Sequence, residues 1–175
     1  NANTLFAWEF IEYEFLSQWI DIKAYANSKG IKIIGDIPIY VAYDSSDVWA
    51  NKNEFQLDSK GRLKAVAGVP PDYFAEDGQL WGNPLYDWNV MKKNGYAWWS
   101  ERLKYMLELF DGVRIDHFRG LEAYWSVPAD AKTAKEGKWV KGPGRKFVDA
   151  VRKIAGENLI IAEDLGDITE DVVKL

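Results

Sequence analysis

Helix-like and strand-like hydrophobic patterns alternate along the chain. From Phe6 to Ser28, apolar residues recur near the spacing of an amphipathic helix. Gly30 then supplies a helix stop, because glycine adopts the left-handed conformation without steric cost. Residues 31–41, IKIIGDIPIYV, form an apolar, β-branched run that is typical of a strand buried on both faces. A helix followed by such a strand is half of a βαβ unit.

The same order occurs twice more. Residues 96–110 predict a helix that turns through a glycine into a strand over 112–116. Residues 145–155 predict a third helix, which a glycine separates from a strand over 158–163. Three such units in series predict an α/β fold with a parallel sheet, either open or closed into a barrel.

The segment of about residues 43–95, between the first two strands, breaks this pattern. It is rich in turn formers and in aromatic residues. Connections of this length are usually functional or disordered, and so many aromatic residues are not typical of disorder. We therefore expect an inserted subdomain over the top of the sheet, with most of its aromatic side chains in a core. Trp81, which lies in the turn-rich sequence LWGNPLY, is the one we expect to face a ligand.

A carboxylate lies near the C-terminal end of each of the three predicted strands: Asp36, Asp116 and Glu163. Ligands bind at this end of the strands in parallel α/β sheets and barrels. A single acid in such a place commonly caps a turn. Three acids at the same place in three units instead predict a site.

Arg114 and Asp116 are two positions apart on one strand, so both project from the same face, opposite to Val113 and Ile115. A neighbouring guanidinium favours the ionised form of a carboxylate, and a nucleophile needs that form. A purely structural buried Arg–Asp pair would stabilise the fold little compared with apolar packing. We interpret Asp116 as a nucleophile with Arg114 as its companion.

Glu163 follows an apolar run, LIIA, which favours the protonated form of a carboxyl group by desolvation. One ionised and one protonated carboxyl group, about 5–5.5 Å apart, form the nucleophile and the acid/base of a retaining glycosidase. His117, the single histidine, directly follows Asp116 and is a candidate for hydrogen bonding to a sugar hydroxyl.

The charge and composition of the chain indicate which kinds of binding partner and site are not expected. The net charge is −5, from 22 basic and 27 acidic side chains without a run of one sign, so no nucleic-acid or basic membrane-binding surface is indicated. The chain has no cysteine, which excludes disulfides and thiolate metal sites and fits a reducing, cytoplasmic location. No apolar stretch approaches the ~20 residues of a membrane span.

Several motifs together resemble the 4-α-glucanotransferase (amylomaltase, or disproportionating enzyme) family. GVPPDYF, RIDHFRG and AEDLG occur in this order and are highly specific. The matching stretches cover most of the chain, and they are residues 31–51, 66–88, 110–128, 137–144 and 159–166.

The resemblance implies a retaining transfer of α-1,4-glucan segments between maltooligosaccharides, without a cofactor or a metal. By position, it makes Asp116 the nucleophile, Glu163 the general acid/base and Arg114 the companion of the nucleophile. Asp36 becomes a structural acid near the sugar. His117, Trp81 and Asn83 fall among the substrate contacts.

The resemblance also implies a (β/α)8 barrel, and such a barrel needs ~250 residues. We therefore expect residues 1–175 to be a fragment of one catalytic barrel domain, with about three of its strands. The family's third carboxylate, an Asp on a later strand, would lie outside the chain. Such a fragment is expected to self-associate through its exposed edges and to be inactive by itself.

Two other functions remain open from the residues alone. Acids that end consecutive barrel strands can bind Mg²⁺, as in a metal-dependent lyase or racemase. Alternatively, the aromatic side chains could serve a non-catalytic carbohydrate-binding module, although this would leave Arg114 and the two catalytic acids without a purpose.

Overall fold

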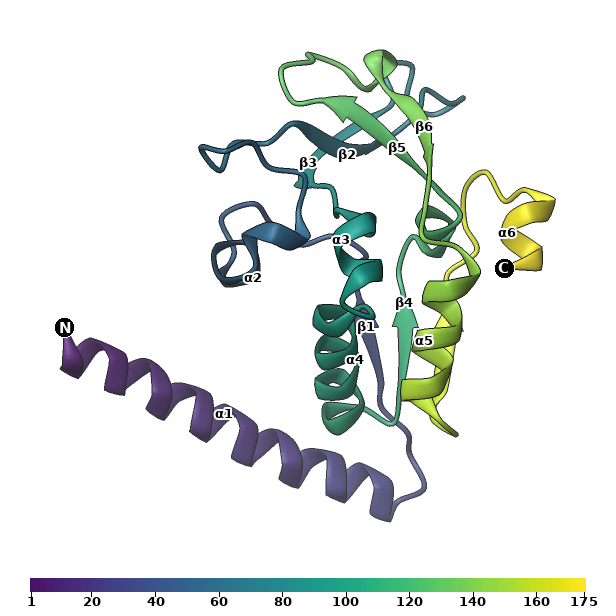
Figure 1. Cartoon of the computed structure of the whole chain (residues 1–175). Coiled ribbons are helices and arrows are strands. Elements are labelled where there is room, and N and C mark those ends of the chain that lie inside the picture. The colour runs from purple at the N-terminus through teal and green to yellow at the C-terminus, as the bar shows by residue number, and fades with distance from the viewer.

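Three helix–strand units follow one another along the chain, as the hydrophobic pattern predicts. The computed structural model describes residues 1–175 (Figure 1). Its three strands form a parallel sheet in the order β1-β4-β7, which confirms the predicted parallel sheet. The six elements of these units are α1 (Ala2–Ser28), β1 (Ile34–Ile37), α4 (Ala97–Leu109), β4 (Gly112–Ile115), α5 (Arg145–Ala155) and β7 (Leu159–Ala162).

The first strand is shorter than the hydrophobic run that predicts it. β1 ends at Ile37, whereas the run continues to residue 41. Pro38 follows the strand, and because proline has no N–H it cannot continue the ladder of hydrogen bonds. The run beyond it still enters the core, where Ile39 and Tyr40 are buried.

β4, the central strand, separates the core from the site. Val113 and Ile115 are completely buried, while Arg114 projects from the other face and is partly exposed. This alternation is the one predicted from the spacing of the residues along the strand. The next residue, Asp116, donates its N–H to the carbonyl oxygen of Ile37 at 2.9 Å.

A second, antiparallel sheet lies beyond the C-terminal ends of β1 and β4 (Figure 1). Its strand order is β3-β2-β5-β6. β2 (Ala65–Val69) and β3 (Gln79–Pro84) come from the segment expected to be an inserted subdomain. β5 (Ala123–Pro128) and β6 (Lys138–Lys141) come from residues after β4, to which the hydrophobic pattern assigned no strand. The strands of the 43–95 segment therefore complete their sheet with later residues.

Short helices connect these elements. Three of them are α-helices, namely α2 (Ser46–Ala50), α3 (Trp88–Lys93) and α6 (Glu170–Lys174). Three are 3₁₀ turns, namely η1 (Lys52–Glu54), η2 (Phe118–Leu121) and η3 (Ala134–Glu136).

Aromatic side chains join the two layers. Trp99 of α4 packs against Phe147 of α5 with ring centroids 5.2 Å apart, and against Tyr86 at 5.8 Å. All three are fully buried. Tyr86 also donates its hydroxyl to the carbonyl oxygen of Ile39 at 2.6 Å, so this core cluster ties the segment before α3 to the end of β1.

α1 projects away from the rest of the molecule (Figure 1). None of its residues is buried, and large apolar side chains such as Phe6, Trp8 and Tyr25 are more than 60% exposed. The helix is attached along its C-terminal half, where Trp19 Nε1 donates to the carbonyl oxygen of Leu109 at 2.9 Å and Lys23 Nζ to that of Glu108 at 2.8 Å. None of the helices combines the length and the apolar character needed to cross a membrane. The cytoplasmic location stays a prediction.

Replacing Leu103 by alanine should destabilise the fold by about 2–5 kcal/mol, since Leu103 is 1% exposed in the core and its loss leaves a cavity. Glu101→Ala on the same helix is the matched control. Glu101 makes only an exposed ion pair with Lys104, so we expect a change below about 1 kcal/mol. Urea unfolding measures both, and equal effects of the two changes would contradict the packing described for α4.

Candidate active site

Arg114 joins two acids at the C-terminal ends of neighbouring strands. Its Nε and Nη2 donate to the two carboxylate oxygens of Asp36 at 2.9 and 2.8 Å. The same Nη2 lies 2.9 Å from Oδ1 of Asp116. Hydrogen bonding to Asp36 raises the pKa of the Arg114 guanidinium. The side chains of Arg114, Asp36 and Asp116 are 36%, 53% and 45% exposed. Arg114 is therefore a fixed positive charge shared by both carboxylates.

This arrangement differs from the sequence analysis in two respects. Asp36 receives two hydrogen bonds from Arg114, so it is tied to the guanidinium more firmly than Asp116 is. The pair is also partly exposed, because it lies where the strands end and not between layers. A partly exposed ion pair contributes little to stability, so its main effect is to fix the position of the Asp116 carboxylate.

Glu163 is held by two backbone donors. Its Oε2 accepts the N–H of His117 at 3.0 Å, and its Oε1 accepts the N–H of Leu165 at 2.8 Å. Its own N–H donates to the carbonyl oxygen of Ile115, so Glu163 follows β7 as Asp116 follows β4. Because Asp116 and Glu163 directly follow two neighbouring parallel strands, both carboxylates lie at the same edge of the sheet.

The apolar surroundings expected for Glu163 are not formed by the strand that precedes it. Leu159 and Ile161 are 51% and 37% exposed, because β7 is an edge strand of the three-stranded sheet. Glu163 itself is half-buried. Within the chain, backbone N–H groups orient Glu163, and its apolar neighbours come from a cavity that it borders together with residues of α6.

His117 lies between the two acids in an unusual backbone conformation. Its φ of 51° is in the left-handed region, which non-glycine residues rarely adopt and which recurs at functional sites. Its ring meets Trp81 edge-on, with centroids 4.9 Å apart. Burial, assisted by the charge of Arg119 and opposed by Asp116, lowers the pKa of His117 from 6.5 to about 4. At neutral pH the imidazole is therefore uncharged, with one donor and one acceptor nitrogen.

We expect the imidazole of His117 to titrate with a midpoint near pH 4 in the folded protein and near 6.5 after unfolding. Since folding favours the neutral form, its contribution to stability is present above pH 6.5 and declines as the pH falls towards 4. Proton NMR can follow this directly, because His117 is the single histidine of the chain. A midpoint near 6.5 in the folded protein would contradict the buried environment.

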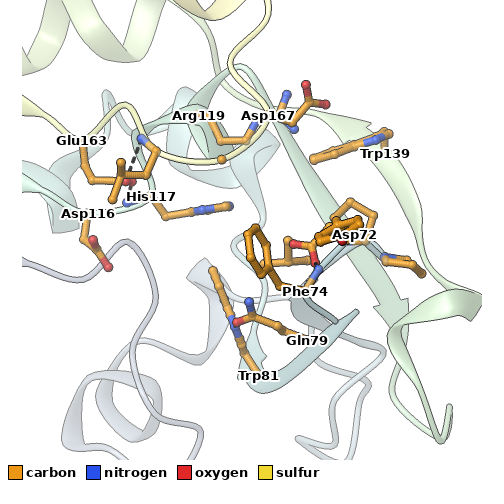
Figure 2. Close-up of a pocket in the computed structure, with 16 residues that line it drawn as sticks. Asp72, Phe74, Gln79, Trp81, Asp116, His117, Arg119, Trp139, Glu163 and Asp167 are labelled. Atoms are coloured by element: carbon orange, nitrogen blue, oxygen red, sulfur yellow. Dashed lines mark hydrogen bonds between the residues drawn. The ribbon is translucent and has the colours of Figure 1, made fainter. Parts of the chain in front are cut away.

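A cleft of about 710 Å³ opens over these residues (Figure 2). Of the residues singled out from the sequence, it is lined by Asp116, Glu163, His117 and Trp81. Asp36 and Arg114 do not line it, but Arg114 contacts the Asp116 carboxylate, which does. The structure thus brings the two proposed catalytic acids, the histidine and one tryptophan to a single cavity.

Asn83 lies beside this cleft. Its Nδ2 donates to the carbonyl oxygen of Val41 at 3.0 Å, so part of its amide is already used within the fold. It lines a smaller adjoining cavity of about 160 Å³, together with Trp81, Asp116 and His117. A direct contact of Asn83 with a ligand would therefore have to be made from that side.

Several residues that line the cleft were not predicted as site residues. Tyr73 and Phe74 are 97% and 95% exposed on the loop between β2 and β3, where Asp72 Oδ1 accepts the N–H of Phe74 at 2.8 Å. Trp139 of β6 and the buried Arg119 also line the cleft. The turn-forming sequence PPDYF and the tryptophan in GKWVKGPG were the available signals. Neither shows by itself that the loop and β6 face the same cavity.

The family model described as 4-alpha-glucanotransferase matches residues 1–175. The chain is 56% identical over 164 residues to a 4-alpha-glucanotransferase of Streptococcus pneumoniae, which covers 94% of the chain and 32% of that protein. It is 55% identical over 169 residues to a 4-alpha-glucanotransferase of Clostridium butyricum, with 95% and 34% covered.

A solved amylomaltase from Streptococcus agalactiae in complex with acarbose superimposes with a TM-score of 0.89. It is 44% identical, and the match covers 93% of the chain and 33% of that structure. The chain spans about a third of the length of the relatives that it matches. Since the family model matches its whole length, the chain belongs to the 4-alpha-glucanotransferase family.

Proposed function

We propose that the protein carrying this chain is a retaining 4-α-glucanotransferase that acts on maltooligosaccharides. The observation that carries the proposal is the placement of Asp116 and Glu163 at the ends of neighbouring parallel strands, where both line one cleft. A nucleophilic carboxylate and an acid/base carboxyl group are what retaining transfer between sugars requires. Family membership and the acarbose complex of the Streptococcus agalactiae amylomaltase support an α-glucan as the substrate.

In the first step, an oxygen of Asp116 attacks the anomeric carbon of a glucose unit. The bond to the next sugar breaks as Glu163 gives its proton to the leaving oxygen, and the glucan segment is left esterified to Asp116. In the second step, Glu163 takes the proton from a hydroxyl of an acceptor glucan, whose oxygen displaces Asp116. Two inversions retain the configuration, and no water is consumed when the acceptor is a sugar.

Arg114 holds the Asp116 carboxylate in position for attack, and Asp36 fixes Arg114 in turn. His117 offers one donor and one acceptor nitrogen to sugar hydroxyls near the broken bond. Trp81, whose side chain is partly exposed in the cleft, supplies a flat apolar surface for a glucose ring, and Asn83 contacts substrate from the adjoining cavity.

We also propose that β1, β4 and β7 are one arc of a (β/α)8 barrel, over which the 43–95 segment forms an inserted subdomain. Their parallel order, with the site at the C-terminal ends of the strands, is the arrangement of barrel enzymes. The extensive exposed apolar surface of α1 supports the further proposal that the isolated 175-residue chain self-associates, which sedimentation analysis would measure.

Incubation with maltotriose tests the proposed function. A transferase converts maltotriose into glucose and longer maltooligosaccharides while the number of reducing ends stays constant. A hydrolase would increase that number, and a binding module would leave maltotriose unchanged. The complete protein that carries these residues is the sample for this test, because we propose that the 175 residues alone are inactive.

The geometry disfavours the two other functions. In a metal-dependent lyase or racemase, Asp36, Asp116 and Glu163 would turn their oxygens to one cation. Instead, Asp36 and Asp116 bind Arg114, and both oxygens of Glu163 accept backbone N–H groups. A binding module would need the aromatic surface of the cleft but has no use for the two acids at its base.

A further inference from the structure

Trp139 of β6 lies at the end of the cleft that is remote from Asp116 (Figure 2). Besides the cleft, Trp139 lines a second cavity of about 390 Å³, which Asp116 does not touch. Asp116 in turn lines the small cavity on its own side, which Trp139 does not touch. The cleft therefore continues past Trp139 into further space along β6.

The indole of Trp139 packs against other side chains but is still partly exposed to solvent. The guanidinium carbon of Arg119 lies 3.9 Å from the centroid of the indole ring, a cation–π contact. The ring of Trp125 meets it at 5.2 Å with an interplanar angle of 74°. In spite of these contacts, Trp139 is 40% exposed. It is thus a rigid aromatic surface that borders the cleft.

Packing alone does not explain why Arg119 is buried, because its burial is energetically unfavourable. It is 4% exposed, its nearest acid is Glu122 at 3.7 Å, and its Nε and Nη1 have no hydrogen-bond partner. Burying unpaired N–H groups of a charged side chain costs free energy that an apolar residue would avoid. Arg119 lines both the cleft and the second cavity, and its guanidinium packs against the indole of Trp139, so it holds that ring where the two spaces meet.

We propose that Trp139 is the platform of an outer subsite for a glucose unit of the glucan chain, and that Arg119 is its positioning residue. The inference rests on the proposed function, since it concerns the substrate of the same cleft. A glucose ring has an apolar face that suits an indole, and hydroxyls at its rim that suit N–H donors and carboxylates. Asp72 and Asp167 border the same cleft and supply such acceptors. A long glucan reaches this subsite, whereas a short one that occupies the positions next to Asp116 does not.

The test compares maltotriose with maltoheptaose in the complete protein. Trp139→Leu keeps an apolar side chain but removes the flat surface. We expect it to raise the ratio of KM for maltoheptaose to KM for maltotriose about tenfold, the effect of losing roughly one aromatic stacking contact. Trp139→Phe should restore most of the ratio. Trp49→Leu is the matched control, because Trp49 is 76% exposed on α2 and lines neither cavity.

An unchanged ratio in Trp139→Leu would overturn the subsite, as would an equal rise in KM for both sugars. Calorimetric titration with maltoheptaose, carried out in an Asp116→Asn background, gives a readout without turnover. Weaker binding on adding Trp139→Leu supports the subsite even if the wild-type protein proves not to transfer glucan. Equal binding with and without Trp139→Leu overturns it, whatever reaction the protein catalyses.

Discussion

Replacing Asp116 by asparagine should reduce kcat for maltotriose disproportionation by about a thousandfold or more. An amide cannot form the ester intermediate, so the first displacement is lost and not merely slowed. The fold should tolerate the change, because Arg114 retains both hydrogen bonds to Asp36 and Asp116 is nearly half exposed. The rate of glucose release from maltotriose measures the effect.

Asp164→Asn is the matched control for this substitution. Asp164 is an exposed acid next to Glu163, but unlike Glu163 it does not line the cleft that contains Asp116. We expect its kcat to stay within about threefold of the wild-type value. Asp116→Asn should still bind maltoheptaose, since the aromatic wall of the cleft is intact. Turnover by Asp116→Asn within tenfold of the wild type would remove Asp116 from the role of nucleophile.

The parallel part of the fold could be predicted because its signals are local. The third helix begins and ends at the predicted residues, Arg145 and Ala155, since a glycine precedes it and another follows it. The antiparallel sheet could not be predicted in the same way. β2 pairs with β5, and Val66 lies opposite Val127 across 61 positions of sequence. No hydrophobic period within either strand identifies such a partner.

The same difference between local signals and long-range pairing applies to the candidate site. Asp116 and Glu163 could be placed together because parallel strands end at one edge of a sheet, and Arg114 because it shares a face with Asp116. Two other features of the site depend on strand pairings that could not be predicted from the sequence. Arg114 divides its donors between two acids, because β1 aligns Asp36 with it. Trp139 enters the cleft because β6 is carried over the site by its pairing with β5.

The two proposed catalytic acids are held by different means, and this bears on the roles proposed for them. Asp116 is bound by a charged side chain, whereas Glu163 is bound only by neutral backbone N–H groups. The proposed nucleophile is held in position by its contact with the guanidinium of Arg114. An acid/base must change its protonation state twice in each cycle, and a permanent positive charge in contact would oppose this. Such a difference between two neighbouring carboxyl groups is how acid and base roles are divided in glycoside-cleaving sites.

Replacing Glu163 by glutamine should therefore give a defect that depends on the leaving group. With maltotriose, whose leaving oxygen needs a proton, we expect kcat/KM to fall by about 10²–10⁴-fold. With an α-maltosyl fluoride donor, whose leaving group departs without a proton, formation of the intermediate should be nearly as fast as in the wild type. The second step then lacks its base, so the glycosyl–Asp116 ester should accumulate, and the mass of the intact protein will show it.

Glutamine also tests the local structure, because both oxygens of Glu163 accept backbone N–H groups and an amide can replace only one of them as an acceptor. The other donor, from His117 or Leu165, would face an NH₂ group. We therefore expect a small loss of thermal stability. Any loss of rate that results from this structural change should be the same with maltotriose and with the fluoride. An equal loss of rate with maltotriose and with the fluoride would mean that Glu163 only supports the loop. A selective loss, with the adduct on Asp116, requires that Glu163 itself moves the proton.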